Sequence, residues 1–379
     1  MRILCAPDSF KGSLSSFQAA NILREALEEV FPKATVHTAP MADGGEGTCD
    51  VLVKSRKGRY VQVPTVDALG RKRIAAYGEL DHNTAVIETA AAIGLPMLTE
   101  LERNPFQTSS WGAGILLRHG IMQGYHTIYV ALGGSATNDG GLGALAALGV
   151  RFLDRRGHIL PPVVSSLKQI QDIDLQDLPD LTNTRVIALC DVDIPLLGPT
   201  GATMVFGKQK GATPAQQLAL EAAMEHYADI LQYKLGTSVR ELHGAGAAGG
   251  LGAALSAVFG AELHSGIDIV LDLLEMDQAV EEADLIITGE GKLDAQTAYG
   301  KVIHGLGQLC KKMKRPLIAV VGALDIPIEQ YQNFGVTVAV PIGEQPQAVS
   351  ETMKNASILL KKAAIRAGKL LQIGGQIKA

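Results

Sequence analysis

The chain has 379 residues, of which 47% are hydrophobic and 19% charged, and its formal net charge is −5. This composition excludes an intrinsically disordered chain, and the length favours two domains over one. Proteins that bind nucleic acid usually present a basic face, so the acidic balance argues against a nucleic-acid partner.

The start of the chain and its cysteines indicate a cytoplasmic protein without a membrane partner. After Met1 a very short apolar run is followed by Asp8, which is unlike a secretion signal. The longest uncharged stretch, 244–261, is mostly Gly and Ala and lacks the Leu, Ile and Phe that favour membrane insertion. The 4 cysteines are far apart in sequence, so we expect them to be buried in a protein of a reducing compartment.

The N-terminal segment alternates apolar strands with helices. Residues 2–6 and 35–39 predict two buried strands, each followed by a polar loop and a helix. The first helix is expected over 16–31, because Ser15 and Gln18 form a capping-box pattern and Pro32 ends the periodic run. The second helix is expected to end at about Lys54.

The rest of the chain continues this pattern. Extended segments are expected at 60–66, 73–80, 84–88, 127–132 and 185–190, and further strands at 284–288, 316–321 and 337–341. Helices at 300–313, 326–332 and 348–368 lie between and after the last strands. Such alternation favours an α/β fold with a parallel sheet covered on both faces. We therefore predict a five-stranded doubly wound domain from 1–60 plus 281–379, with 61–280 as an inserted domain.

Several polar, glycine-rich loops follow these strands. In open α/β sheets, ligands bind where strand carboxyl ends meet helix amino ends, since the backbone N–H groups there favour anions. The loop 133–141, with the sequence GGSATNDGG, follows the segment at 127–132. Its candidate phosphate- or substrate-binding residues are Gly133, Gly134, Ser135, Thr137 and Asp139. The alternative is a tight strand-to-helix turn capped by Asn or Asp.

Two carboxylates directly follow the segment at 185–190. Asp191 and Asp193 are two residues apart, and on an extended chain such side chains point the same way. Both can then face one Mg²⁺ ion, which takes one or two carboxylates together with phosphate oxygens and water. An Asx-turn before Pro195 is an equally good explanation.

Three further loops are expected at the same kind of sheet edge. Asp8, Ser9 and Lys11 follow the first strand, and Asp43, Gly44 and Gly45 follow the second. Glu290 and Lys292 follow the strand at 284–288, where Lys292 can meet a phosphate or a carboxylate as a point charge. Each residue taken singly is more often a cap or a solvated side chain, and only their joint position favours a site.

The segment 244–249 fits the G-x-G-x-x-G pattern of dinucleotide-binding proteins. That motif needs an apolar strand before it, and residues 239–243 are too polar and too short for one. We expect a glycine-rich helix start packed closely on another element. The alternative that this pattern supports is a nicotinamide-dependent hydroxy-acid dehydrogenase, and a non-catalytic anion-binding protein is a third possibility.

The ordered set of loops resembles the class I glycerate kinase family. The matching segments are 6–14 (APDSFKGSL), 41–48 (MADGGEGT), 133–141, 190–193 (CDVD), 205–212, 244–250 and 287–291 (ITGEG), and they cover nearly the whole chain in the family's order. Two positions depart from the family pattern, with Ile194 where Asn is usual and Lys208 where Pro is usual.

The resemblance implies a flavodoxin-like domain with an inserted domain of restriction-endonuclease-like fold. It also implies an ATP- and Mg²⁺-dependent enzyme that converts D-glycerate to 2-phosphoglycerate. On this basis we expect the loop 133–141 to hold ATP phosphates and Lys11 to neutralise phosphate charge. Asp191 or Asp193 is expected to bind Mg²⁺ or to accept the proton of the 2-hydroxyl. The sequence leaves the oligomeric state open.

Overall fold

The computed structural model describes residues 1–294, 297, 301–345 and 348–376. The chain divides into two compact units, the first made of Met1–Asp43 and Ile267–Ala379 and the second of Gly44–Gly266. The predicted division at 60 and 281 differs from this one. It assigns α2 (Thr48–Ser55) to the first unit, and α9 (Gly266–Leu273) with most of α10 (Met276–Glu282) to the second.

Packing explains where the two boundaries lie. The helix α2 packs on the sheet of the second unit, where Val53 lies against Gly78. The helices α9 and α10 instead contribute Ile267 and Met276 to a core of the first unit that includes Leu4. Buried apolar contacts therefore assign these helices, and a pattern of helices and strands along the sequence does not contain that information.

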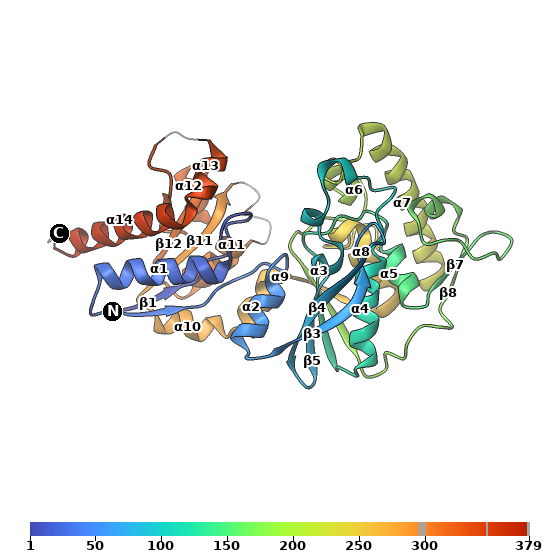
Figure 1. Ribbon diagram of the computed structural model, residues 1–379, viewed down its shortest axis with the longest axis horizontal. Helices are drawn as coiled ribbons and strands as arrows, with labels where there is room; N and C mark the ends of the chain where they lie inside the picture. The colour runs from blue at the N-terminus through green and yellow to red at the C-terminus, as the bar shows by residue number, and fades with distance from the viewer. Residues whose placement is uncertain (295–296, 298–300, 346–347, 377–379) are drawn as a thin grey trace. The chain divides into compact units, whose positions relative to one another are not determined.

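A five-stranded parallel sheet forms the centre of the first unit (Figure 1). Its strands are β1 (Arg2–Cys5), β2 (Thr35–Thr38), β11 (Leu285–Leu293), β12 (Leu317–Leu324) and β13 (Val338–Pro341). They lie in the order β13-β12-β11-β1-β2, which is 2-1-3-4-5 when the strands are numbered within this unit. Flavodoxin-like doubly wound sheets have this order. The predicted α/β fold class is confirmed.

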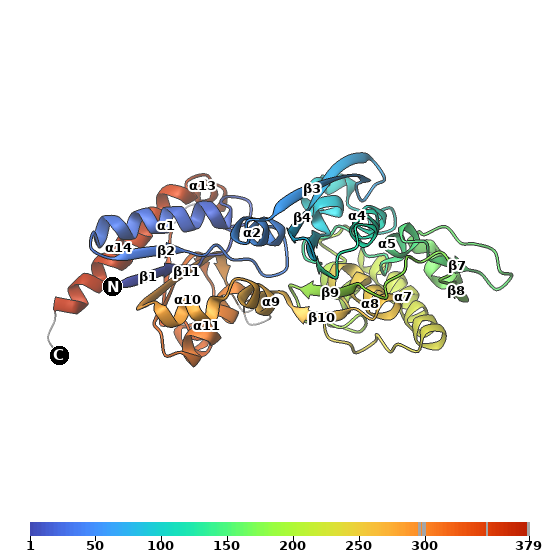
Figure 2. The same cartoon turned by 90° about the horizontal axis from the view of Figure 1, so that it is seen from below.

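Helices cover both faces of this sheet. Successive side chains of a strand point to opposite faces, so Ile3 and Leu4 belong to different cores. The Ile3 side packs against α1 (Ser16–Val30) and α14 (Ala356–Gln376), and the Leu4 side packs against α9, α10 and α11 (Val302–Lys312). Figure 2 shows α1 and α14 on one side of the strands and α10 and α11 on the other. The short helices α12 (Ile328–Asn333) and α13 (Val349–Lys354) complete the described elements of this unit.

The local signals for α1 are confirmed. The Ser15 hydroxyl accepts a hydrogen bond from Gln18 N at 3.2 Å, and Gln18 Oε1 accepts one from Ser15 N at 2.9 Å. Its buried face includes Leu23 and Leu27, and the helix ends at Val30, shortly before the predicted position. The last helical segment is different from the prediction, because 348–368 contains two helices, α13 and α14, rather than one.

The loop predicted after the strand at 284–288 is wrong. The strand β11 continues to Leu293, so Glu290 and Lys292 are strand residues paired with Val321 and Ala323 of β12. The glycines of this stretch allow close packing rather than a turn. A Cβ on Gly289 would lie 2.4 Å from Val320 O, and one on Gly322 would lie 2.3 Å from Gly291 O.

The second unit is built on a six-stranded mixed sheet in the order β10-β9-β6-β5-β4-β3. Its strands are β3 (Arg59–Val66), β4 (Lys72–Asp81), β5 (Thr84–Glu88), β6 (Thr127–Ala131), β9 (Arg185–Cys190) and β10 (Glu262–Ser265). The strands β3, β4 and β5 pair antiparallel, whereas β5, β6, β9 and β10 are parallel. The carboxyl ends of these four strands therefore lie at one edge of the sheet.

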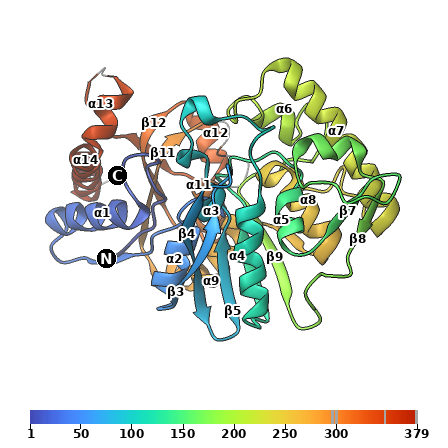
Figure 3. The same ribbon diagram turned by 45° about the vertical axis from the view of Figure 1, so that its right-hand side comes forward.

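The helices of the second unit also cover both faces of its sheet. They are α2, α3 (Ala90–Ile93), α4 (Trp111–Met122), α5 (Leu142–Ala147), α6 (Ala202–Phe206), α7 (Pro214–Leu235) and α8 (Ala247–Phe259). Cys49 of α2 contacts Val86, and Gly120 of α4 lies against Ile87, which points to the opposite face. Figure 3 shows α4 alongside β3–β5. A separate hairpin pairs β7 (Arg151–Leu153) with β8 (Asp172–Asp174), and 3-10 turns span Leu95–Met97, Glu100–Glu102 and Val164–Gln169.

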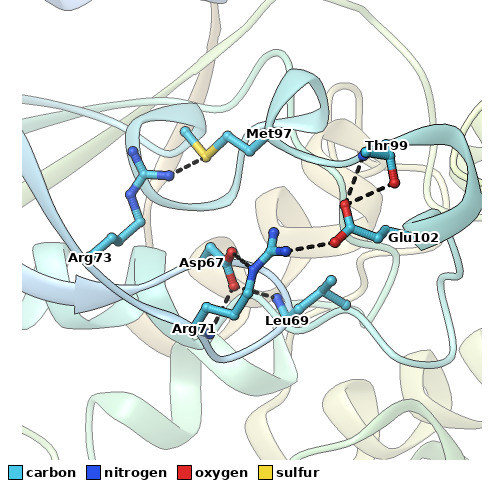
Figure 4. A network of polar contacts seen from close by, with 7 residues as sticks. All are labelled: Asp67, Leu69, Arg71, Arg73, Met97, Thr99 and Glu102. Carbon is cyan, nitrogen blue, oxygen red and sulfur yellow. Dashed lines mark hydrogen bonds and ion pairs between the residues drawn. The ribbon is translucent and has the colours of Figure 1, made fainter.

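A network of polar contacts anchors the turn between β3 and β4 (Figure 4). Asp67 accepts hydrogen bonds from Leu69 N and Arg71 N, both at 2.9 Å, and pairs with the Arg71 guanidinium. The same guanidinium donates to Glu102 at 2.6 Å, and Glu102 accepts from Thr99 N at 2.9 Å. The network holds the β3–β4 hairpin against the segment that follows α3.

The expected burial of the cysteines is confirmed. All four cysteines are buried and unpaired, as expected for small apolar side chains. Within the described ranges, no helix is both long enough and apolar enough to cross a membrane.

Candidate functional site

All six predicted site residues of the first unit line one cavity of about 470 Å³. They come from the carboxyl ends of three neighbouring strands, β2, β1 and β11, and comprise Asp8, Ser9, Lys11, Asp43, Glu290 and Lys292. Lys301, which the sequence analysis missed, also lines the cavity. Its apolar wall includes Phe10, Ile342 and Met353.

Backbone hydrogen bonds hold the first loop against the sheet. Asp8 N donates to Gly289 O at 2.8 Å, and Met41 N donates to Pro7 O at 2.9 Å. Beyond Asp8 the chain makes a tight turn, in which Phe10 N donates to Leu14 O at 2.8 Å. Lys11 lies in this turn, so its position is fixed by the turn rather than by a helix or strand.

Burial and mutual repulsion perturb the carboxyl groups of this cavity. The pKa of Asp8 is raised well above its ordinary value, first by burial and then by the negative charge of Asp43. Burial is also the main cause that raises the pKa of Glu290 to about 7. Thr297 Oγ1 donates to Glu290 Oε1 at 3.0 Å and opposes this rise. Such perturbed, clustered carboxyl groups are typical of functional sites.

Lys292 belongs to the more exposed rim of the cavity. Its ammonium pairs with Asp325 at 2.9 Å and with Asp294 at 3.3 Å. These hydrogen bonds raise the pKa of Lys292, so it carries a full positive charge at neutral pH. Lys301 also lies within ion-pair distance of Asp294, at 3.9 Å, so Lys11, Lys292 and Lys301 together give the cavity three ammonium groups that can meet an anion.

A second, smaller cavity of about 70 Å³ lies at the sheet edge of the second unit. Predicted residues that line it are Gly133, Gly134, Ser135 and Asp191, from the loops after β6 and β9. These strands are parallel neighbours, and Leu132 N donates to Leu189 O at 3.1 Å beyond the end of β6. A Cβ on Gly133 would lie 2.7 Å from Asp191 Oδ2, so only glycine lets the carboxylate lie against the loop.

Lys210 also lines this cavity, and the sequence analysis did not single it out as a site residue. It lies in the loop between α6 and α7 and is only 4% exposed. Its ammonium donates to Thr137 O at 2.7 Å and to Ser135 Oγ at 3.4 Å. Burial lowers its pKa to about 8, against the attraction of Asp191 and Asp139. The sequence gives no signal for its burial, because its neighbours Lys208 and Gln209 are exposed and equally polar.

Two predicted residues of the loop 133–141 support the cavity rather than line it. Asp139 is fully buried and accepts hydrogen bonds from Ser110 N and Oγ at 2.8 Å and from the amides of Gly141 and Gly143 at 3.2 Å. Burial raises its pKa despite these contacts. Thr137 is also fully buried and presents its carbonyl to Lys210. These contacts favour the capped-turn alternative for Asp139 over direct contact with a ligand.

Asp191 and Asp193 do not share the cavity, although their spacing predicts a common ligand. The backbone leaves the extended conformation after Cys190, and only Asp191 lines the cavity. The Asp193 carboxylate is 59% exposed and lies 3.0 Å from His243 Nδ1. In the part of the chain that the structure describes, no group of three or more His, Cys, Asp or Glu side chains is arranged to hold a metal ion.

Gly44 and Gly45 pack beneath the second cavity rather than lining it. Gly133 N donates to Gly44 O at 3.2 Å, and a Cβ on Gly133 would lie 2.5 Å from Gly45 Cα. The following residues are fixed by Glu88, a buried residue that the sequence analysis missed. Glu88 Oε2 accepts from Gly47 N at 3.1 Å and Cys49 N at 3.2 Å, and burial raises its pKa to about 7.

The glycine-rich segment 244–250 packs closely on another element, as predicted, and that element is the loop 133–141. The φ angles of Ala248, Gly249 and Gly250 are all positive at the start of α8. A Cβ on Gly249 would lie 2.2 Å from Thr137 O, and Gly140 N donates to Gly249 O at 3.0 Å. The motif therefore shapes the second cavity by close backbone packing, and the strand that a dinucleotide fingerprint requires before it is replaced by irregular chain.

Comparisons with known proteins place this geometry in a family. The model of the glycerate kinase family matches residues 3–372. Similar proteins include the glycerate kinase of Bacillus subtilis (strain 168), 39% identical over 96% of both chains, and the glycerate 2-kinase of Escherichia coli (strain K12), 37% identical over 99% of both. The crystal structure of a protein assigned as glycerate kinase 2 from Salmonella typhimurium LT2 matches with a TM-score of 0.85 and 38% identity, and the match covers 100% of both chains. The chain belongs to the glycerate kinase family.

Proposed function

We propose that this protein transfers the γ-phosphoryl group of ATP to the 2-hydroxyl of D-glycerate, giving 2-phosphoglycerate and ADP. The observation that carries the proposal is the small cavity of the second unit, in which a glycine loop, the Asp191 carboxylate and Lys210 meet in a member of the glycerate kinase family. The similar protein from Escherichia coli is a glycerate 2-kinase, which supports the 2-hydroxyl as the acceptor.

The size of the second cavity suits the small acceptor. Its volume of about 70 Å³ is far below the about 470 Å³ of the first cavity, so of the two substrates the smaller one is the better match for it. A three-carbon hydroxy acid needs one cationic and one proton-accepting partner, and Lys210 and Asp191 offer both. We therefore assign the Gly133–Ser135 segment to glycerate, in place of the role in holding the triphosphate that the sequence suggested.

The cavity of the first unit suits the nucleotide. Its volume of about 470 Å³ lies within the roughly 300–1,000 Å³ that is usual for small-molecule sites. It combines an apolar wall with Lys11 and Lys301, and ammonium groups are common partners of phosphate oxygens. We assign this cavity to ATP, with Lys11 neutralising charge on the phosphates.

The donor set fits Mg²⁺ that is held largely by phosphate. Asp191 offers one carboxylate, and Mg²⁺ in nucleotide sites keeps phosphate oxygens and water as its other ligands. When bound, the ion neutralises charge on the phosphate oxygens. Asp191 has two candidate roles, as the carboxylate that holds the ion and as the group that accepts the 2-hydroxyl proton. Asp193 is the weaker candidate for both, because it is exposed and paired with His243.

Two matched variants test the assignment of Asp191. The substitution D191N is expected to lower kcat for D-glycerate-dependent ADP formation by about 10²- to 10⁴-fold, the usual range for loss of a general base. D193N is expected to change it by no more than about threefold, since exposed ion pairs contribute little. Near-normal turnover in D191N, or a larger loss in D193N, would contradict the assignment.

A titration in the same variant separates the two roles of Asp191. If the carboxylate holds Mg²⁺, the residual activity of D191N requires a higher Mg²⁺ concentration for half-maximal rate. If it accepts the proton, the Mg²⁺ dependence is unchanged and the decline of kcat at acidic pH disappears.

A further inference from the structure

Lys210 is a buried cation whose hydrogen bonds are only partly satisfied by the protein. An ammonium group has three donors, and in the described part of the chain those of Lys210 reach two neutral oxygens, Thr137 O and Ser135 Oγ. The bond to Thr137 O at 2.7 Å is short, whereas the one to Ser135 Oγ at 3.4 Å is long. At least one donor is therefore left for a group outside the protein.

The charge of Lys210 is also incompletely compensated. Among the described residues of the second unit, no carboxylate lies within ion-pair distance of its ammonium, although Asp191 and Asp139 act on it from further away. Asp139 is occupied by Ser110 and by the amides of its own loop. Burying a charge without a counter-ion is costly, so binding of an anionic group next to Lys210 would be favourable.

The cavity has opposite electrostatic character at two places. Lys210 and Ser135 offer donors, and the Asp191 carboxylate offers an acceptor from the loop after β9. A ligand that fits must carry an anionic group and a hydroxyl group a few bonds apart. A 2-hydroxycarboxylate has this arrangement, and the reverse orientation would bring its carboxylate against Asp191.

We propose that Lys210 binds the carboxylate of the acceptor substrate and thereby makes the second cavity specific for 2-hydroxycarboxylates. This inference rests on the proposed function for the identity of the substrate. Lys210 orients the acid so that its 2-hydroxyl faces Asp191, and the Ser135 hydroxyl shares the carboxylate. The bond to Thr137 O holds the lysine in place, and Gly133, Gly134 and Ser135 line the cavity that receives the substrate.

The test compares K210M with K208M, a neighbour in the same loop that is exposed. For K210M we expect the KM for D-glycerate to rise by about 10- to 100-fold, the range for loss of one hydrogen bond to a charged group, while the KM for ATP stays within about twofold. K208M should match the unsubstituted enzyme in both constants. The variant K210Q, which keeps a donor for Thr137 O but no charge, should behave like K210M.

The outcomes separate a binding role from a structural one. An unchanged KM for D-glycerate in both K210M and K210Q overturns the inference. An equal rise in the KM for D-glycerate and in the KM for ATP, together with a lowered Tm, also overturns it. That pattern indicates a residue that only stabilises the loop.

Calorimetric titration with D-glycerate distinguishes failure here from failure of the proposed function. Binding to the unsubstituted protein that is lost in K210M supports the inference even where no ADP is formed. If the unsubstituted protein phosphorylates D-glycerate and K210M binds D-glycerate with equal affinity, the proposed function stands and Lys210 has no role in binding the substrate.

Discussion

Glu290 shows how burial sets the charge of a single residue in the first unit. It is 4% exposed, and its pKa is raised from 4.5 to about 7, chiefly by burial and against the attraction of Lys301. The folded chain therefore holds the Glu290 proton more tightly than the unfolded chain does. The resulting contribution to stability is fully present below about pH 4.5 and is lost as the pH rises through 7.

The substitution E290Q keeps the shape of the side chain and removes this dependence. At pH 8 we expect E290Q to be more stable than the unsubstituted protein by on the order of 3 kcal/mol, since one unit of pKa corresponds to about 1.36 kcal/mol. Near pH 4.5 the difference should vanish. Urea unfolding at the two pH values measures it, with the exposed E100Q as a control, and a difference that is equal at both values would contradict the account.

For individual residues, the sequence predicts which of them follow the strands but not which partners they contact. Asp8, Asp43, Ser135 and Asp191 could be placed at a sheet edge because parallel strands end together. The contact that draws Asp193 away from its expected partner comes from His243, 50 residues later. Such a long-range contact depends on the packing of the folded chain. The burial of Lys210 depends on packing in the same way.

The glycine-rich start of α8 is the element whose backbone shapes the second cavity most directly. Gly249 has a φ of 66° and lies so close to the loop 133–141 that a Cβ would approach Thr137 O to 2.2 Å. Gly157 has a φ of 79° with nothing near the position of a Cβ. Alanine substitutions at these two glycines therefore separate the free-energy cost of a side chain on a left-handed backbone from the cost of a steric clash.

We expect G157A to lower the free energy of unfolding by about 1 kcal/mol, the cost of placing a side chain in the left-handed region. G249A should lower it by about 3 kcal/mol or more, because the clash forces the loop 133–141 to move. It should also raise the KM for D-glycerate, which G157A should leave unchanged. Equal effects of the two substitutions in urea unfolding would show that the close approach is unimportant.

For the strands, the sequence predicts their existence better than the positions at which they end. Every strand of the first sheet was found from its apolar residues, since buried parallel strands are continuously apolar. In the second sheet β10 (Glu262–Ser265) was missed, because its sequence ELHS is polar at three of four positions. The end of β11 was missed because Gly289 and Gly291 suggest a turn, whereas here they let neighbouring backbone and Phe10 approach closely. The sequence alone does not distinguish these two uses of glycine.

At the scale of the molecule, the second unit is a continuous insertion into the first. It runs from Gly44 to Gly266, and these two residues lie side by side, since a Cβ on Gly44 would be 2.9 Å from Gly266 Cα. Among the described residues, its hydrophobic core draws only on residues of the same unit. An insertion whose ends meet can be added to a domain without separating the strands on either side of it.

We expect the fragment 44–266 to fold by itself, because the unit holds a complete sheet and core. Circular dichroism and a cooperative urea transition would measure this. The complementary chain, with Asp43 joined to Ile267 by a short glycine linker, should retain its five-stranded sheet. A fragment 44–266 without a cooperative transition would contradict the view that the two units are separate folding units.

The most direct test of the proposed function is the position of the phosphate in the product. Purified protein is incubated with ATP, Mg²⁺ and D-glycerate, and pyruvate is followed through enolase and pyruvate kinase without phosphoglycerate mutase. We expect pyruvate to form without mutase, because 2-phosphoglycerate is a direct substrate of enolase. Pyruvate that appears only after mutase is added would assign the phosphate to the 3-hydroxyl, and the absence of both pyruvate and ADP would contradict glycerate kinase activity itself.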